Sequence, residues 1–174
     1  VGLTLGSAEK DAEKKLAAGW IFSEFDGKEI KNLVADGPSL DAGKPFPRLV
    51  EEQAGKRLLF QHGAYLHKGG TQFQKQLNGR DFELEVTLTP TARPDGYCGG
   101  IYQHMIYRKV GFRMTLGQNM LLSVAVQRPS DNVYVTSPTP LQLHRSYRIV
   151  TAFKGGKTYL YVNQQLAACE TCPA

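Results

Sequence analysis

Glu83 and Glu85 alternate along the segment FELEVTL, so both carboxylates project from one face of an extended strand. Paired carboxylates are the groups that retaining glycoside hydrolases use, about 5–5.5 Å apart across the scissile bond. The segment ELEVTL adds no third carboxylate beside this pair, and a solvent-facing strand carries the same pattern. The sequence therefore favours a non-enzymatic function over an enzymatic one. We assign no catalytic residue and keep Glu83 and Glu85 as an alternative catalytic pair.

Four polar side chains on the following segments have the chemistry of a sugar site: Tyr102, His104, Arg113 and Gln127. Tyr102 and His104 alternate in GGIYQHMIY, whereas Arg113 and Gln127 alternate with apolar residues further along the chain. Sugar recognition requires planar donors and acceptors together with an aromatic platform. We predict that these four residues bind a ligand on one sheet face. An ordinary wetted sheet face is the alternative.

Cys169 and Cys172 form a single C-x-x-C pair, which supplies half of the ligands of a zinc site. The pair also lacks the strand and helix that surround a redox C-x-x-C. We predict a disulfide between Cys169 and Cys172 and keep pairing outside this segment, metal binding and redox chemistry as alternatives.

The remaining metal-ligating residues do not define a metal site. The four histidines match no zinc spacing; they are His62, His67, His104 and His144. Acidic residues in expected loops keep calcium open as a cofactor without a defined ligand set; they are Asp36, Asp41, Asp95 and Asp131.

Short apolar-polar alternations with turn residues between them predict many strands, as in a sandwich or barrel. The clearest strand is 82–88, and others are expected at 57–61, 64–66, 97–107, 110–116, 120–127, 132–136, 146–153 and 157–163. A helix is expected at 8–18, between an N-capping Ser7 and a C-capping Gly19. We therefore expect an N-terminal strand, helix or linker segment at 1–19 and a β-sandwich at 20–174.

Three segments carry a family resemblance: AGKRLLFQHGAYL, GRDFELEVTLTPTA and PLQLHRSYRIVTAFKGGKTYLYVNQQLAA. Their order across residues 20–168 resembles the laminin-G-like, concanavalin A-like lectin/glucanase superfamily. The resemblance implies an all-β, two-sheet antiparallel jelly-roll sandwich. It also implies a sheet face or a rim loop, at times with calcium, as the place where a ligand binds.

The sequence departs from the family pattern in three places. Ser146 stands where the family has tryptophan, and Asn163-Gln164 stands where it has an Asn-Gly turn suited to positive φ. The family also has two more strands after this hairpin, so we expect a sandwich that lacks its last strands. The segment VGLTLG or another chain would then complete it.

Charge and hydropathy narrow the function. The 174 residues carry a formal net charge of +5 in scattered positions, so no nucleic-acid partner is expected. No apolar run approaches the roughly 20 residues of a membrane span. We predict a non-catalytic recognition module that binds carbohydrate or a protein partner within a larger extracytoplasmic protein, either secreted, periplasmic or at the cell surface. The alternatives are a jelly-roll glycoside hydrolase or polysaccharide lyase, and a structural subunit completed by another chain.

Overall fold

The computed structural model divides the chain into two compact units, Val1–Arg80 and Asp81–Ala174. It describes residues 2–5, 15–19, 24–34, 39–42, 48–52, 55–59, 65–66, 80–106, 110–127 and 132–170. The sequence predicted a boundary between residues 19 and 20, whereas the structure groups residues 1–80 together. Each unit is therefore described separately.

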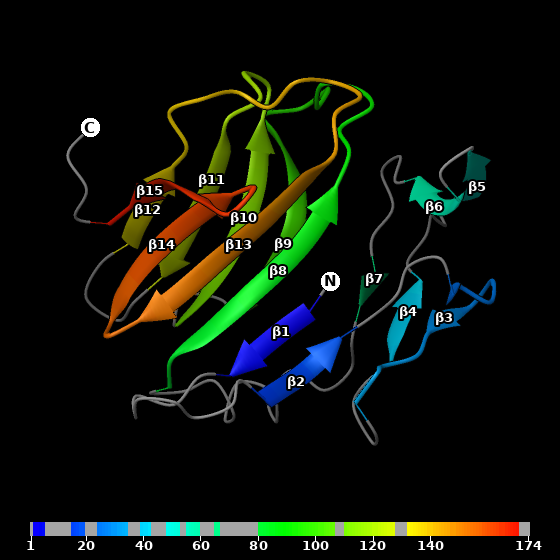
Figure 1. Ribbon diagram of the computed structural model, residues 1–174, viewed down its shortest axis with the longest axis horizontal. Helices are drawn as coiled ribbons and strands as arrows, with labels where there is room; N and C mark the ends of the chain where they lie inside the picture. The colour runs from blue at the N-terminus through cyan, green and yellow to red at the C-terminus, as the bar shows by residue number, and fades with distance from the viewer. Residues whose placement is uncertain are drawn as a thin grey trace. The chain divides into compact units, whose positions relative to one another are not determined.

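The first unit consists of short strands in its described parts (Figure 1). Strands β1 (Gly2–Leu5) and β2 (Lys15–Gly19) pair antiparallel. Strands β3 (Glu29–Ile30), β4 (Leu40–Ala42) and β7 (Tyr65–Leu66) form a small sheet in that order. Strands β5 (Arg48–Glu52) and β6 (Gly55–Leu59) form a separate hairpin. The strands expected at 57–61 and 64–66 thus correspond to β6 and β7.

The helix expected at 8–18 is wrong where the structure describes this segment. Residues 15–19 form β2, in which Leu16 pairs with Thr4 and Ala18 pairs with Leu3. Lys, Leu and Ala favour a helix by intrinsic propensity, but that preference is less than about 1 kcal/mol per residue and pairing with another strand can override it. Residues 8–14 lie outside the described residues.

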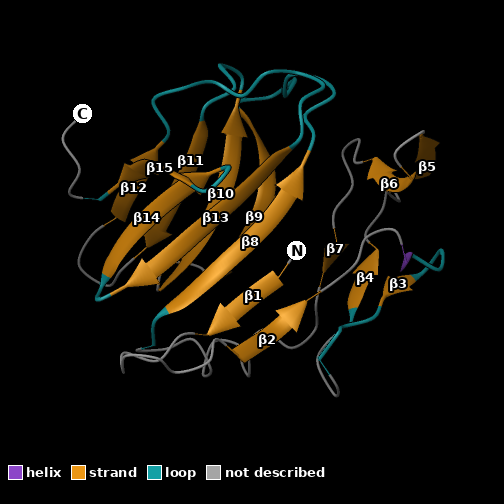
Figure 2. Ribbon diagram, in the orientation of Figure 1, coloured by secondary structure: helices purple, strands orange, loops and turns teal. Residues whose placement is uncertain are grey.

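The second unit consists of two antiparallel sheets (Figures 1 and 2). One contains β8 (Phe82–Leu88), β13 (Tyr147–Lys154), β14 (Lys157–Val162) and β15 (Gln165–Cys169), with neighbours in the order β15-β14-β13-β8. The other has the order β12-β11-β10-β9 and contains β9 (Cys98–Ile106), β10 (Val110–Gly117), β11 (Leu122–Gln127) and β12 (Asn132–Thr136). The expected strands from residue 82 onward agree with these bounds to within about two residues.

Strand β15 was not expected, because the alternation at 165–169 is weak. It pairs antiparallel with β14, so one strand follows the hairpin after which the sandwich was expected to stop. Asn163 and Gln164 form the turn between β14 and β15 with φ of 49° and 70°. The predicted Gly155-Gly156 turn between β13 and β14 is confirmed, with both residues at positive φ.

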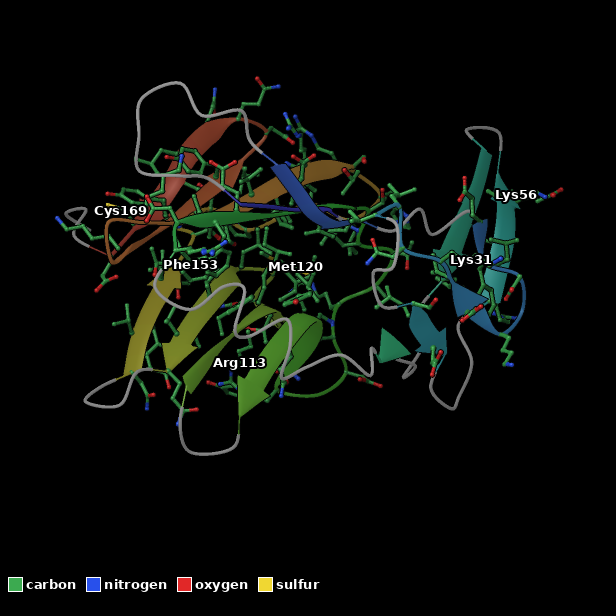
Figure 3. The ribbon with its side chains drawn as sticks, turned by 90° about the horizontal axis from the view of Figure 1, so that it is seen from below. Lys31, Lys56, Arg113, Met120, Phe153 and Cys169 are labelled. Carbon is green, nitrogen blue, oxygen red and sulfur yellow. The ribbon has the colours of Figure 1, made fainter. Side chains whose placement is uncertain are left out.

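The core of this unit lies between the two sheets. Alternate residues of β8 are buried and face the buried residues of β10, and Phe82 and Phe112 bring the sheets together with ring centroids 5.4 Å apart. Phe153 stacks on Phe82 at 4.3 Å. Figure 3 shows Phe153 and Met120 between the layers. Period-two alternation therefore builds an all-β sandwich with one buried and one outward face per sheet.

Candidate functional site

The outward face of the β12-β11-β10-β9 sheet is defined by register. Residues directly opposite each other in antiparallel strands share a face, and Phe112, Met114 and Leu116 of β10 are buried. Positions 111, 113 and 115 and their cross-strand partners therefore face outward. We call the following set the polar face, in which Met105 is the one large apolar member: Gly100, Gln103, Met105, Gly111, Arg113, Thr115, Ser123, Ala125, Gln127, Asn132, Tyr134 and Thr136.

The central row of the polar face crosses all four strands. Gln103 pairs with Arg113, Arg113 pairs with Ala125, and Ala125 pairs with Tyr134. Neighbouring strands lie about 4.8 Å apart, so the Cα atoms of Arg113 and Tyr134 are about 10 Å apart. Tyr134 is 61% exposed. Ala125, whose side chain is a single methyl group, lies between Arg113 and Tyr134, so in this row no large side chain fills the space between the guanidinium and the aromatic ring.

A row of hydroxyl groups borders this space on one side. Thr115 pairs with Ser123, and Ser123 pairs with Thr136. The Oγ of Ser123 and the Oγ1 of Thr136 lie 3.0 Å apart in a hydrogen bond, and the Thr115 hydroxyl donates to the Ser123 carbonyl at 3.5 Å. Each hydroxyl oxygen has two acceptor lone pairs, so the row retains capacity for a ligand.

A row of amides borders the other side. Gln127 pairs with Gly111 on β10 and with Asn132 on β12. Amide side chains offer two donors and one acceptor oxygen each. The polar face thus places hydroxyl groups, a central aromatic ring with a guanidinium, and amides in three successive rows.

Among the residues that define the polar face, Arg113 is the only charged one. Arg113 is half-buried, and within the described part of the chain its side chain forms neither an ion pair nor a hydrogen bond. None of the residues that make up the polar face is Asp or Glu. Among the described residues, the positive charge at the centre of the face therefore has no acidic partner.

The structure does not bring all four predicted ligand-binding residues together. Arg113 and Gln127 lie on the polar face, but Tyr102 pairs with the buried Met114 and stacks on Phe112 with centroids 5.4 Å apart. Burial raises the pKa of Tyr102 above its ordinary range. Tyr102 therefore belongs to the inner side of the sheet. His104 is opposite Phe112 in the register, and its side chain is outside the described part.

The sequence prediction missed Tyr134 as the exposed aromatic residue of this face. Val133 and Val135 flank it in NVYVT, and Val135 is buried. This alternation already placed Tyr134 on the outward side of its strand. The strand was predicted correctly, but its aromatic residue was not considered as a platform.

Glu83 and Glu85 lie on the outward side of the other sheet, where each is bound to a cation. The Lys154 Nζ is 2.7 Å from Glu83 Oε1, and Arg148 donates to both oxygens of Glu85 at 2.8 and 2.7 Å. The hydrogen bond from Arg148 lowers the pKa of Glu85. A general acid in a glycosidase needs a raised pKa, so Glu85 has the opposite electrostatic environment.

A hollow of about 400 Å³ lies between the loop at residues 137–147 and the β14–β15 hairpin. Several of its polar groups hold these two elements in place. The Tyr147 hydroxyl accepts from the Gln142 backbone N–H at 2.8 Å, and Asn163 Oδ1 accepts from the Arg148 N–H at 3.0 Å. Arg145 donates to Gln142 Oε1 at 3.4 Å. We therefore interpret the hollow as a structural feature of the loop and hairpin.

The cysteines and the acidic residues of the predicted loops are not among the residues that define the polar face. Cys169 is disulfide-bonded and Cys98 is a free thiol; Cys172 is outside the described part, so its pairing with Cys169 stays a prediction. Asp41, expected in a loop, lies in β4. Within the described ranges no three His, Cys, Asp or Glu side chains gather as metal ligands. Asp36, Asp131, His62 and His67 are outside those ranges.

Comparisons with protein families, with curated proteins and with solved structures find no match to this chain. In the parts that the structure describes, no helix has the length and apolar character needed to cross a membrane. Functional inference therefore depends on the geometry of the polar face.

Proposed function

We propose that this chain is a non-catalytic recognition module that binds carbohydrate on the polar face. The observation that carries the proposal is the row Tyr134–Ala125–Arg113, in which a small residue separates an exposed aromatic ring from an unpaired guanidinium. Sugars present apolar ring faces that stack on aromatic side chains, and hydroxyl groups that hydrogen-bond to planar polar groups. The rows of hydroxyls and amides beside this space supply those partners.

We further propose that this module belongs to the jelly-roll sandwiches of the concanavalin A-like class, which also consist of two packed antiparallel sheets. Strand β8 pairs with β13, and the intervening strands β9–β12 form the opposite sheet. The chain therefore passes from one sheet to the other and back, as a sandwich requires. The disulfide-bonded Cys169 favours an oxidising, extracytoplasmic location.

A glycoside hydrolase is the less favoured alternative. Both carboxylates that could act as a catalytic pair are neutralised by Lys154 and Arg148 on the neighbouring strand. Charge pairing of this kind stabilises the ionised form of an acid. The two ion pairs therefore favour a structural role, at the protein surface, for Glu83 and Glu85.

A glycan array with the full chain tests the proposal. We expect binding to at least one glycan class and a loss of about tenfold or more in affinity in Tyr134→Ala, which corresponds to about 1.4 kcal/mol. The matched control is Tyr97→Ala, because Tyr97 is 93% exposed but lies in the loop before β9. Equal loss in both variants, or retention of binding in Tyr134→Ala, would contradict the assignment of the polar face.

A further inference from the structure

We infer that the polar face selects acidic saccharides, and that the Arg113 guanidinium binds their carboxylate or sulfate group while the Tyr134 ring packs against the sugar. This inference rests on the proposed carbohydrate function and goes beyond it by naming the class of ligand. It depends on three features of the face: the charge of Arg113, the space around that side chain, and the absence of acidic residues from the set.

The guanidinium of Arg113 has different partners from the cationic side chains of the opposite sheet. Arg148 and Lys154 each lie 2.7 Å from a glutamate oxygen, so their charges are compensated within the fold. Arg113 is half-buried and has no such partner among the described residues. A partly desolvated charge gains more from an opposite charge than one in bulk water does. An anion is therefore the ligand group that this position favours most.

The outward-facing neighbours of Arg113 are mostly small. Along β10 the adjacent outward positions are Gly111 and Thr115, and across the strands they are Ala125 and Gln103. Three of these four residues are small. A guanidinium offers donors in a planar fork that matches two oxygens of a carboxylate or a sulfate. An unpaired guanidinium among small neighbours is thus suited to bidentate binding of an acidic group.

The separation of the two anchors favours a saccharide over an isolated anion. Arg113 and Tyr134 are two strands apart, about 10 Å between Cα atoms. A free inorganic anion would engage Arg113 alone. An acidic sugar ring would place its charged substituent at Arg113 and an apolar ring face at Tyr134, with Ala125 beneath it.

The test compares acidic polysaccharides with neutral partners of the same backbone. Isothermal calorimetry would use polygalacturonate against its fully methyl-esterified form, and dextran sulfate against dextran. We expect at least one acidic member to bind about tenfold or more tightly than its neutral partner, since a charge-assisted bidentate contact contributes that much. The first pair reports a carboxylate and the second a sulfate ester, so the two sources of charge are distinguished.

Variants then assign the selectivity to one residue. Arg113→Gln should remove the preference for the acidic member, whereas the control Arg93→Gln, in an exposed loop, should retain it. Circular dichroism melts would confirm that both variants fold. Equal affinity for acidic and neutral partners, or an unchanged preference in Arg113→Gln, would overturn the inference.

Two further outcomes separate this inference from the proposed function. If a neutral polysaccharide binds as tightly as its acidic partner and Tyr134→Ala abolishes binding, carbohydrate recognition stands and acid selectivity fails. If none of the four polysaccharides binds, acid selectivity fails and the glycan array decides the proposed function. If a single-stranded oligonucleotide binds more tightly than all of them, both the function and its acidic specificity are overturned.

Discussion

Tyr134 and Arg113 lie on either side of Ala125 in one row across three adjacent strands of the β12-β11-β10-β9 sheet. Ala125 places only a methyl group between them, and the hydroxyl and amide rows lie on either side of this row. This relationship is set by strand register, because a shift of one residue in either pair would turn one of the three side chains toward the core.

Filling the space over Ala125 should block the ligand without unfolding the protein. Ala125→Trp places a large ring between Arg113 and Tyr134, so we expect affinity for the bound glycan to fall about tenfold or more. Thermal unfolding should change little, because position 125 faces outward. Thr87→Trp, at an exposed position of the other sheet, is the control. Unimpaired binding in Ala125→Trp would place the ligand elsewhere.

Tyr102→Phe should leave glycan binding unchanged, because Tyr102 lies on the inner side of its sheet. The variant should also alter the response of stability to alkaline pH. Burial raises the pKa of Tyr102, so the folded state keeps a proton that the unfolded chain loses. The free energy of unfolding should therefore decrease as pH rises through the ordinary tyrosine pKa. Chemical denaturation across that range should show a smaller decrease in Tyr102→Phe, and an identical decrease would contradict this placement.

The outcome for Tyr102 shows where sequence reasoning reached its limit. The segment FELEVTL was predicted as β8 with its bounds correct, because strong alternation fixes both the strand and its buried side. The segment GGIYQHMIY has polar and apolar residues on both sides, so its alternation does not decide which side is buried. Register with β10, including the irregularity between Met114 and Thr115, places Tyr102 opposite Met114. The register between β9 and β10 could therefore not be predicted from the alternation in this segment.

Local propensity failed in a different way at residues 15–19. Their composition favours a helix, but the backbone pairs with β1. Such pairing depends on residues of another strand, which the propensity of residues 15–19 does not represent. In contrast, Arg113 and Gln127 were placed on the outward face correctly, because they alternate with residues of clear apolar character.

The turn between β14 and β15 should be improved by glycine. Gln164 has a φ of 70°, a left-handed conformation that costs a residue with a Cβ about 1–2 kcal/mol. Glycine also adds entropy to the unfolded chain, which offsets part of this gain. We therefore expect Gln164→Gly to raise the free energy of unfolding by about 0.5–1 kcal/mol. Urea denaturation would measure it. Gln165→Gly, the adjacent position within β15, should instead destabilise the protein, and stabilisation by both would contradict this explanation.

The ion pair between Glu85 and Arg148 should contribute stability that disappears in acid. Arg148 lowers the pKa of Glu85 in the folded state by hydrogen bonding. The contribution is therefore present above the ordinary glutamate pKa and is lost as pH falls through the lowered value. Both side chains are more than one-third exposed, so the effect should be small and weakened by salt.

A double-mutant cycle over pH checks this ion pair. Glu85→Gln and Arg148→Gln should each remove the same acid-dependent part of the free energy of unfolding, and the double variant should remove no more. Additive losses in the two single variants would show that the groups act independently.

Heteronuclear NMR, in which the protein is titrated with a glycan that binds on the array, tests the central claim most directly. We predict that the largest amide shifts fall on outward positions of β10, β11 and β12, above all Arg113, Ala125 and Tyr134, and that they vanish in Tyr134→Ala. Shifts concentrated around Glu83 and Glu85, along the β14–β15 hairpin or within residues 1–80 would contradict the polar face as the ligand-binding site.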